Sequence, residues 1–376
     1  MTKKICFFVR NYSYTSGVER VTSVISNHLA SLGHDVTILS LWGGMTPAYD
    51  KHPNIKLYQI FEGRVSREGK TPLFVKQAMR FPLAAIGARK FLREHPQDIL
   101  IDTDYWLGLV ASPALLGRQP VYVHWEHIYF NVDPPGSFKR FARKMTARIA
   151  QGIVTLTERD KESWIKGATV KGNIKAIHNP IPFDVPNVQY NLESKVVLAV
   201  GRLDDQKGYD LLLQAWSYIE SSVKGEGWKL HIVGDGDNYN DLMELRSKLN
   251  IEDSTEMIPA TSDVDSHYRS AAIYCLSSRF EGFPMVLLEA QAYKLPTVAF
   301  DCDTGPAEIV INNETGYLVE NGNVKAFADA LLKLISSKED RSIFSSNSAD
   351  AAQRFYIAPI AEQWIEYLDN ITTQKA

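Results

Sequence analysis

Short apolar runs alternate with longer amphipathic stretches along the whole chain. Residues 4–10 and 35–40 are apolar runs of strand length. Residues 17–32 between them have the apolar spacing of a helix, and Gly33 ends this stretch. A strand, a helix and a second strand at this spacing form a βαβ unit, whose strands run parallel. The pattern therefore predicts an α/β protein built on doubly wound parallel sheets.

The same alternation continues over the rest of the 376 residues, with one interruption. Residues 179–195 are rich in proline and polar residues, which is typical of a linker between domains. The further runs that predict strands are 98–104, 120–127, 151–157, 173–178, 195–200, 229–233, 271–276, 297–300 and 316–319. A chain of this length can bury two cores of ordinary size. We therefore expect one domain at 1–185, a second at 186–356, and a final helix in 357–376.

The most informative stretch is 277–290, which follows the apolar run at 271–276. It begins with polar residues, contains Gly282 and Pro284, and continues from Met285 with good helix formers. Glycine allows a tight backbone turn, and proline suits the first turn of a helix. The expected strand, loop and helix would direct backbone N–H groups and the positive end of the helix dipole at one point, which suits a phosphate.

Two carboxylates bracket this loop. Glu281 lies in the loop itself, and Glu289 lies about two turns into the expected helix. A pair of this kind can bind sugar hydroxyls or transfer protons. The alternative is that Glu281 only caps the helix and that Glu289 is a solvated surface charge.

A second loop of the same kind, residues 201–208, follows another predicted strand. Arg202 and Lys207 lie in it, ahead of an amphipathic helix expected at 209–219. Two cations on a strand-to-helix loop are placed to bind a diphosphate. The alternative is that both are exposed loop charges. The later turn at 234–237 contains only G-x-G, which is too little for a dinucleotide-binding fingerprint.

The first half also has a polar loop that opens onto a helix. Residues 11–17 end on Gly17, at the expected start of the first helix, and form a possible second anion site. Glu19 and Arg20 follow in the first turn. The alternative for these two residues is that they are surface charges.

Further polar residues lie at the ends of two predicted strands. Asp102 and Asp104 form an Asp-x-Asp pair, but short acidic pairs are common at strand ends, and we predict no metal site. His124, Glu126 and His127 end the next strand, where ligands of open α/β sheets bind. Because strand residues alternate in direction, His124 and Glu126 share one side. We expect His124 to be structural and His127 to donate a hydrogen bond to a sugar hydroxyl.

Composition and charge narrow the class of protein. The apolar and charged fractions, 45% and 23%, are those of a soluble globular protein. Cys6, Cys275 and Cys302 are widely spaced, which fits buried thiols in a reducing cytoplasm. The N-terminal apolar run is too short for a signal peptide, and no run of about 18 apolar residues could span a membrane. Residues 1–180 have a net charge of +11 and the rest −14, so the first half is suited to an anionic partner.

Two segments of this basic half combine cations with aromatic residues. Residues 64–93 contain eight basic residues and one acidic residue, and residues 138–148 contain five basic residues and no acidic one. Both segments predict helices with cationic faces, which suits contact with an anionic membrane surface. The alternative is a solvated surface with core contacts. Nucleic acid is not expected as a partner, because the second half is acidic and no recognition motif is present.

These motifs jointly resemble those of glycosyltransferase family 4, whose enzymes have the GT-B fold. Glu281 and Glu289 have the spacing of the family's E-x7-E motif. Residues 201–208 are similar to its phosphate-binding segment, and residues 305–310 are similar to its following loop. Residues 16–20 resemble the family's G-G-x-E-R opening, with serine in place of the first glycine.

The resemblance covers almost the whole chain and implies two Rossmann-like domains facing across a cleft, the acceptor in the first and the donor in the second. It also implies that the final helix, in 357–376, crosses back to the first domain. Arg202 and Lys207 would neutralise the donor diphosphate in place of a metal ion or other cofactor. Glu289 would bind ribose, and Glu281 would hold the sugar. His127, or alternatively His124, would lie near that sugar. The implied catalytic residues are Glu281, His127, Arg202 and Lys207, and the implied donor-binding residues are Gly17, Arg202, Lys207, Gly282, Phe283, Pro284, Met285, Val286 and Glu289.

The family retains anomeric configuration, and no residue here is recognisable as a carboxylate nucleophile, so we expect same-face attack. Residues 283–293 and 300–306 are similar to bacterial enzymes that assemble surface polysaccharide, lipopolysaccharide or capsule on polyprenyl diphosphate. This similarity implies a UDP-sugar or a GDP-sugar donor, with UDP favoured, and a glycolipid acceptor at the cytoplasmic membrane face. The alternatives are a GT-B sugar-nucleotide epimerase, which needs no acceptor, and a non-catalytic sugar-nucleotide-binding protein.

Overall fold

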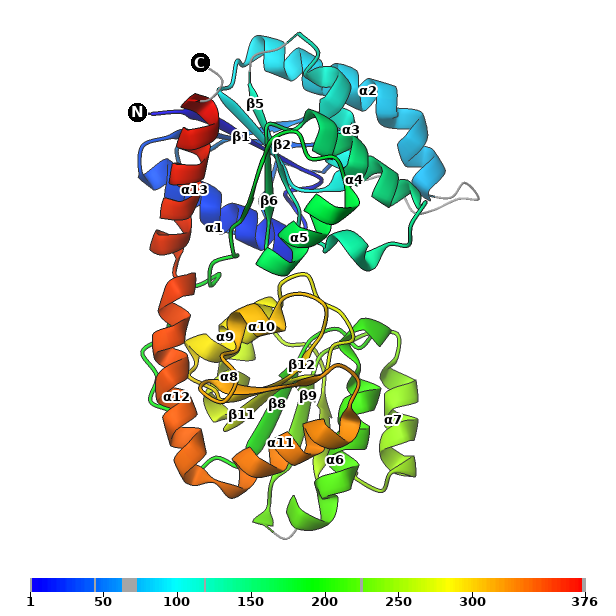
Figure 1. Ribbon diagram of the computed structural model, residues 1–376, viewed down its shortest axis with the longest axis vertical. Coiled ribbons are helices and arrows are strands. Elements are labelled where there is room, and N and C mark those ends of the chain that lie inside the picture. Colours follow the sequence, from blue (N-terminus) through cyan, green and yellow to red (C-terminus); the bar gives the residue numbers. More distant parts are fainter. Residues whose placement is uncertain (1, 44, 63–72, 118–119, 224–225, 374–376) are drawn as a thin grey trace. The chain divides into compact units, whose positions relative to one another are not determined.

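The chain forms two compact units, which Figure 1 shows as ribbons. The computed structural model describes residues 2–43, 45–62, 73–117, 120–223 and 226–373. The first unit comprises residues 1–182 and 357–376, and the second comprises residues 183–356. The sequence predicts the boundaries after residues 185 and 356.

A seven-stranded parallel sheet forms the centre of the first unit, in the order β3-β2-β1-β4-β5-β6-β7. Its strands are β1 (Lys4–Val9), β2 (Asp35–Ser40), β3 (Lys56–Gln59), β4 (Ile99–Asp102), β5 (Val121–Trp125), β6 (Gly152–Thr155) and β7 (Asn173–Ala176). Strand β1 pairs with β2 on one side and with β4 on the other, so the strand order reverses there. Ligands of open α/β sheets bind at the carboxyl ends of the strands beside such a reversal.

Helices cover both faces of this sheet. They are α1 (Gly17–Ser31), α2 (Leu73–Glu94), α3 (Tyr105–Ala114), α4 (Phe138–Ile149), α5 (Glu158–Gly167) and α13 (Ile357–Thr373), with a 3-10 helix at Phe130–Val132. One face is covered by α2 to α5, which bury Trp106, Ala147 and Trp164 against it. Helices α1 and α13 lie side by side on the other face, where Trp364 of α13 packs on Trp125 of β5.

The second unit contains a six-stranded parallel sheet in the order β10-β9-β8-β11-β12-β13. Its strands are β8 (Val196–Val200), β9 (Lys229–Val233), β10 (Thr255–Ile258), β11 (Ile273–Leu276), β12 (Thr297–Asp301) and β13 (Gly316–Glu320). Strand β8 pairs with both β9 and β11, so the order reverses at β8. The loops 201–208 and 277–284 therefore leave neighbouring strands at this reversal.

The helices of the second unit also cover both faces of its sheet. They are α6 (Tyr209–Val223), α7 (Tyr239–Lys248), α8 (Val264–Ser270), α9 (Met285–Ala292), α10 (Pro306–Ile309), α11 (Val324–Ser336) and α12 (Lys338–Ala352), with 3-10 helices at Asp205–Lys207 and Gln353–Phe355. Trp216 of α6 and Leu331 of α11 belong to the core on one face. Tyr274 of β11 lies on the opposite face, where it stacks on Tyr268 of α8.

The predicted fold class is confirmed, because each unit is a doubly wound parallel sheet with helices on both faces. Two short strands, β3 and β10, were not predicted, and each forms an edge of its sheet. No helix in the described part of the chain is both long enough and apolar enough to cross a bilayer.

Candidate active site

Residues 277–290 form the predicted loop and helix after β11. The N-cap of α9 is Pro284, and no side chain of the described residues caps this helix. The alternative that Glu281 serves as the cap is therefore wrong. Glu281 and Glu289 are both buried, so the alternative that Glu289 is a solvated surface charge is wrong as well.

Lys207 joins this loop to the loop after β8. Its Nζ lies 2.7 Å from Glu281 Oε1, and the two side chains are only 15% and 7% exposed. Gln206 Nε2 donates to the carbonyl oxygen of Phe280 at 3.1 Å. The Arg279 N–H donates to the carbonyl oxygen of Gln206 at 2.8 Å. The structure thus brings Lys207 and Glu281 together, and Lys207 is not an exposed loop charge.

Two glycines allow the loops around this ion pair to approach each other closely. Gly208 has a φ of 62°, and a Cβ there would lie 2.2 Å from the carbonyl oxygen of Ser277. Gly305, with a φ of 96°, is as closely packed, since its Cβ would lie 2.5 Å from Pro284 Cδ. A side chain at either position would push the loops apart, so only glycine fits.

Arg202 shares the loop of Lys207 but lies apart from the buried ion pair. Its guanidinium pairs with Asp204 at 2.9 Å, and its side chain is 74% exposed, as the alternative of an exposed loop charge predicts. Arg202 also lines a cavity of about 400 Å³ at the carboxyl ends of β8 and β9, together with Asp235 and with Val264 of α8. This cavity lies where ligands of doubly wound sheets bind.

A stack of tyrosines holds Glu289. The hydroxyl of Tyr268 donates to Glu289 Oε2 at 2.8 Å. The ring of Tyr268 lies between Tyr293 and Tyr274, with centroid separations of 5.0 and 5.9 Å. Burial and the nearby Glu289 carboxylate raise the pKa of Tyr268 well above 10, so the phenol remains a donor. The Glu289 carboxylate is therefore fixed from one side by a rigid aromatic partner.

In the first unit, Gly17 is exposed at the first turn of α1. The hydroxyl of Ser16 donates to the carboxylate of Glu19. Glu19 is buried, and this burial raises the pKa of its carboxyl group. The alternative that Glu19 is a surface charge is therefore wrong.

Asp102 and Asp104 have separate partners. Asp102 Oδ1 lies 2.6 Å from His124 Nδ1, and the same carboxylate accepts the hydroxyl of Tyr122. Asp104 caps α3 through backbone N–H groups and pairs with Arg10 Nε at 2.7 Å. The two carboxylates thus have different structural roles and do not share a partner.

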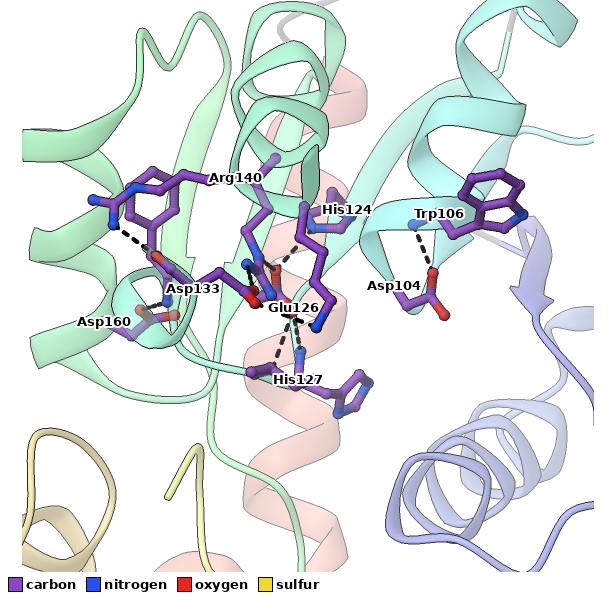
Figure 2. A network of polar contacts seen from close by, with 12 residues as sticks. Asp104, Trp106, His124, Glu126, His127, Asp133, Arg140 and Asp160 are labelled. Atoms are coloured by element: carbon purple, nitrogen blue, oxygen red, sulfur yellow. Dashed lines mark hydrogen bonds and ion pairs between the residues drawn. The ribbon is translucent and has the colours of Figure 1, made fainter. Parts of the chain in front are cut away.

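A buried polar network runs from β5 to α4, and Figure 2 shows it from close by. His124 Nε2 lies 3.6 Å from Glu126 Oε2, which is ion-pair range but too long for a hydrogen bond. Glu126 Oε2 lies 2.6 Å from Arg143 Nε, and Arg143 continues to Asp133 at 2.7 Å. Burial favours neutral His124, but Asp102 and Glu126 outweigh it and raise its pKa to about 10. Burial opposes the charge of Glu126, yet Arg143 and His124 lower its pKa to about 2.

His127 follows this network at the end of β5. Its ring is half-buried and packs on Trp125, with 4.4 Å between centroids. Burial lowers its pKa to about 4, so the imidazole is neutral at pH 7. Across the residues that the structure describes, no hydrogen-bond partner contacts its Nε2. His124 is thus enclosed as a cation, whereas His127 is a neutral group just beyond the strand end.

Two segments, 64–93 and 138–148, were predicted to lie on a membrane. Residues 63–72 lie outside the described residues, so the structure describes only part of the first segment. Helix α2 covers most of the remainder of 64–93, and α4 covers 138–148. Five apolar side chains on or beside α2, α3 and α4 are each more than half exposed: Leu83, Ile86, Leu116, Phe138 and Phe141. Lys139, Lys144 and Arg148 are also exposed. Arg143 is fully buried in an ion pair, so its assignment to a cationic surface is wrong.

Three residues with buried polar contacts were not predicted in these roles: Arg143, Tyr268, and Asp160, whose Oδ1 accepts the N–H of Phe130 at 2.7 Å. Arg143 lies on the buried stripe of α4 with Ala142, Thr146 and Ala147, and this helical spacing could have indicated its burial. Asp160 and Tyr268 reach their partners from helices distant in the sequence, and no local pattern reveals such contacts.

Comparison with known families covers both units. Residues 182–351 match the glycosyl transferases group 1 family, and residues 15–185 match glycosyltransferase family 4. An uncharacterized glycosyltransferase of Haemophilus influenzae is 34% identical over 96% of this chain and 99% of its own. The amylovoran biosynthesis glycosyltransferase AmsD of Erwinia amylovora is 31% identical over 97% of this chain and 99% of its own. An α-1,4-N-acetyl-D-galactosaminyltransferase of Campylobacter jejuni, named for a PP-undecaprenol-linked acceptor, is 24% identical over 98% and 99%.

Solved structures share the fold. Sucrose-phosphate synthase of Thermosynechococcus elongatus has a TM-score of 0.81 at 17% identity, over 99% of this chain and all of its own. Anabaena HepE, solved with UDP-glucose, has a TM-score of 0.73 at 18% identity, over 98% of this chain and all of its own. At these identities the likeness concerns the fold alone.

The two doubly wound units, the family matches and the solved structures that share the fold together define a glycosyltransferase of the GT-B class. The family matches and the full-length relatives then place the chain more closely. It belongs to glycosyltransferase family 4.

Proposed function

We propose that this glycosyltransferase moves a hexose or an N-acetylhexosamine from a UDP-sugar to a polyprenyl-diphosphate-linked sugar, with retention of anomeric configuration and without a metal. A GDP-sugar is the second candidate donor. The observation that carries the proposal is the buried Lys207–Glu281 pair, which joins two loops where the strand order of the second sheet reverses. The place in biology that we propose is the assembly of a surface polysaccharide.

The charge of the leaving nucleoside diphosphate explains the need for cations at these loops. Negative charge grows on the diphosphate as the sugar–phosphate bond breaks. Lys207 is desolvated and fixed by Glu281, so its charge needs little reorganisation to stabilise that state. Arg202 is exposed and can turn from Asp204 to a diphosphate, which a guanidinium binds with two parallel hydrogen bonds. In this proposal the two side chains supply the charge that a metal ion would otherwise provide.

The nucleoside is proposed to occupy the cavity beside Arg202. Val264 lines this cavity, and Tyr268 lies four residues later on the same face of α8. Tyr268 in turn fixes Glu289, and we propose that this carboxylate binds the ribose hydroxyls of a nucleoside in the cavity. The loop from Gly282 to Val286, at the positive end of α9, would hold the sugar and its phosphate.

On the acceptor side we assign the sugar contact to His127. A neutral imidazole can donate to or accept from a sugar hydroxyl, which an imidazolium cannot do in both directions. The carboxylates of Glu281 and Glu126 are held by Lys207 and Arg143, so we assign neither as the nucleophile of a double displacement. In the proposed same-face attack, an oxygen of the leaving phosphate takes the acceptor proton. NMR of the product would exclude this mechanism if the configuration were inverted.

A lipid-linked acceptor fits the exposed surface of α2 and α4. Phe138 and Phe141 alternate with Lys139 and Lys144 there, which suits insertion of aromatic rings between anionic headgroups. The Campylobacter jejuni relative is named for an acceptor of this chemistry. We therefore propose that the protein works at the cytoplasmic face of a membrane.

The test of the proposed function is a release assay. Purified protein is mixed with a panel of UDP-sugars and GDP-sugars, with and without a polyprenyl-diphosphate-linked sugar in detergent, and free nucleoside diphosphate is measured. We expect release that requires the lipid and disappears in Glu281→Ala. Turnover of the sugar nucleotide to an isomer without an acceptor would instead establish the epimerase. No release with any donor and any lipid would contradict the proposed donor and acceptor.

A further inference from the structure

The segment from Glu126 to Phe130 connects β5 to the 3-10 helix that follows and carries His127. Its backbone is held at both ends by buried carboxylates. Glu126 Oε1 accepts the N–H groups of His127 and Ile128, each at 3.1 Å. Asp160 Oδ1 accepts the N–H of Phe130 at 2.7 Å. A strand-exit segment anchored in this way has little freedom to move.

Glu126 can hold these N–H groups only while its carboxylate stays ionised and oriented. It is almost completely buried, and an isolated buried carboxylate would become protonated or turn toward water. His124 on one side and Arg143 on the other both carry positive charge and lie against the same oxygen, Oε2. Because both cations lie against Oε2, Oε1 is left to accept the backbone N–H groups of His127 and Ile128.

Arg143 fixes Glu126 from a different element. It lies on the inward face of α4 and uses two nitrogens, Nε toward Glu126 and the NH1 nitrogen toward Asp133. Asp133 also forms an ion pair with Lys139, whose Nζ lies 3.2 Å from Asp133 Oδ1. The guanidinium is therefore clamped between two carboxylates, and Arg143 is wholly shielded from water. A lysine could reach one of the two carboxylates but could not copy this geometry.

We propose that Glu126 and Arg143 are positioning residues, which hold His127 in place for the acceptor sugar by fixing the backbone of residues 126–130. This inference rests on the proposed role of His127. It goes beyond that role because it assigns a function to a buried ion pair that does not itself contact substrate. A charge placed so deeply is otherwise costly, since an apolar pair of equal volume would pack at least as well.

The direct test is the titration of His127 itself, read by NMR in protein labelled at histidine, with the His127→Gln spectrum used for assignment. Glu126, Asp104 and His124 are the charged groups that face His127. In the wild type, burial keeps the pKa of His127 near 4, so its signals should not shift between about pH 8 and pH 5.5. In Arg143→Met, Glu126 loses its partner and releases the segment. We expect His127 to be exposed and to titrate near its ordinary value of about 6.5.

Activity provides the second measurement. Misplacing a substrate-contacting group lowers turnover more than it weakens binding of a donor held elsewhere. We therefore expect Arg143→Met to reduce kcat about tenfold to a hundredfold, with the KM for the nucleotide sugar changed by less than about twofold. Arg143→Lys keeps the positive charge but can pair with only one of the two carboxylates. Its kcat should therefore lie between those of the wild type and Arg143→Met.

Arg341→Met is the matched control. Arg341 is also a buried arginine, but it lies in the second unit and donates to backbone carbonyl oxygens at the end of α11. Its removal should lower the melting temperature without changing kcat of the folded protein or the titration of His127. Arg341→Met therefore shows what the loss of a buried arginine does by itself, without any change in the position of His127.

The results distinguish failure of the positioning role from failure of the proposed function. A low pKa for His127 and normal kcat in folded Arg143→Met or Arg143→Lys would overturn the positioning role. An equal loss of kcat in Arg341→Met would also overturn it. Absence of sugar transfer by the wild type would count against the proposed function alone, because the titration of His127 needs no substrate.

Discussion

At the scale of single residues, the proposed donor site contains a charged pair that is complete without a substrate. Lys207 and Glu281 neutralise each other at 2.7 Å while both are largely shielded from water. Glu281 fixes the Lys207 side chain in one orientation, and Gln206 beside it ties the same two loops together. The pair therefore holds the Lys207 ammonium in place at the loop before a diphosphate binds.

The carboxylate of Asp160 predicts a specific dependence of stability on pH. Burial raises its pKa to about 7, against the opposing N–H of Phe130, whereas an unfolded aspartate has a pKa near 3.9. The folded state therefore prefers the protonated form, and this contribution to stability is lost as the pH rises from about 4 through about 7. In Asp160→Asn the amide oxygen can still accept the Phe130 N–H, and position 160 no longer carries a titratable group.

We expect the free energy of unfolding of the wild type to fall relative to that of Asp160→Asn by about 2–3 kcal/mol between pH 5 and pH 8. Urea denaturation at several pH values measures this difference directly. A difference that stays constant with pH would contradict the assignment.

Tyr268 gives a prediction about nucleotide binding. Tyr268→Phe keeps the aromatic stack but removes the hydrogen bond to Glu289, and a bond to a charged group contributes about 1.5–3 kcal/mol. If Glu289 binds ribose, the Kd for UDP in calorimetry should rise roughly tenfold to a hundredfold, since about 1.4 kcal/mol corresponds to a factor of ten. Tyr293→Phe is the control, since it keeps the same stack and loses only a bond to Asp265. Equal effects of the two substitutions would count against a role for Glu289.

At the scale of elements, α4 has a buried face and an exposed face for which we propose different functions. Its inner face carries Arg143 into the network that holds His127, and its outer face exposes Phe138 and Phe141. A membrane bound by the outer face would thus lie one helix diameter from the proposed acceptor contact. This arrangement suits an acceptor whose sugar is close to its lipid.

We expect the double variant Phe138→Ser with Phe141→Ser to bind vesicles containing phosphatidylglycerol at least about tenfold more weakly, because each buried ring contributes about 1.5–3 kcal/mol. Co-sedimentation measures this binding. Ile343→Ser, which alters an exposed apolar residue of α12 in the second unit, should bind like the wild type. Unchanged binding of the double variant, or equal wild-type binding to neutral vesicles, would refute the membrane face.

The burial and length of each strand decide how well it could be predicted from the sequence. Central strands such as β11 are buried on both faces and form continuous apolar runs, so their positions and the loops after them could be predicted. The edge strands β3 and β10 are short and mix polar with apolar residues, which leaves a weak pattern. Lys207 and Glu281 were identified through loop position and family resemblance, but their ion pair was not. Such a contact depends on how two distant loops pack, and neither loop encodes it alone.

At the scale of the whole molecule, the last helix belongs to the first unit although the second unit precedes it in the chain. Helix α13 packs beside α1, and Trp364 lies against Trp125 with 4.9 Å between ring centroids. The hydroxyl of Tyr367 donates to the carbonyl oxygen of Asn173 at 2.7 Å. The C-terminal segment is thus part of the core beneath β5, the strand that ends beside His127.

Trp364→Ala should therefore destabilise the first unit by about 3–5 kcal/mol, the usual cost of removing a large buried side chain. Because the two units have separate cores, we expect calorimetry to show an earlier transition for the first unit and an unchanged one for the second. A uniform shift of all unfolding would contradict this division.

We propose that side chains of the second unit, Lys207 above all, stabilise the leaving diphosphate without a metal. The most direct measurement is the rate of acceptor-dependent nucleoside diphosphate release in excess EDTA, for the wild type and Lys207→Met. Lys338→Met, which breaks an exposed pair with Glu193 in the same unit, is the control. We predict full wild-type and control rates in EDTA, and a loss of about a hundredfold or more in Lys207→Met. Loss of wild-type activity in EDTA, or normal turnover by Lys207→Met, would contradict the account.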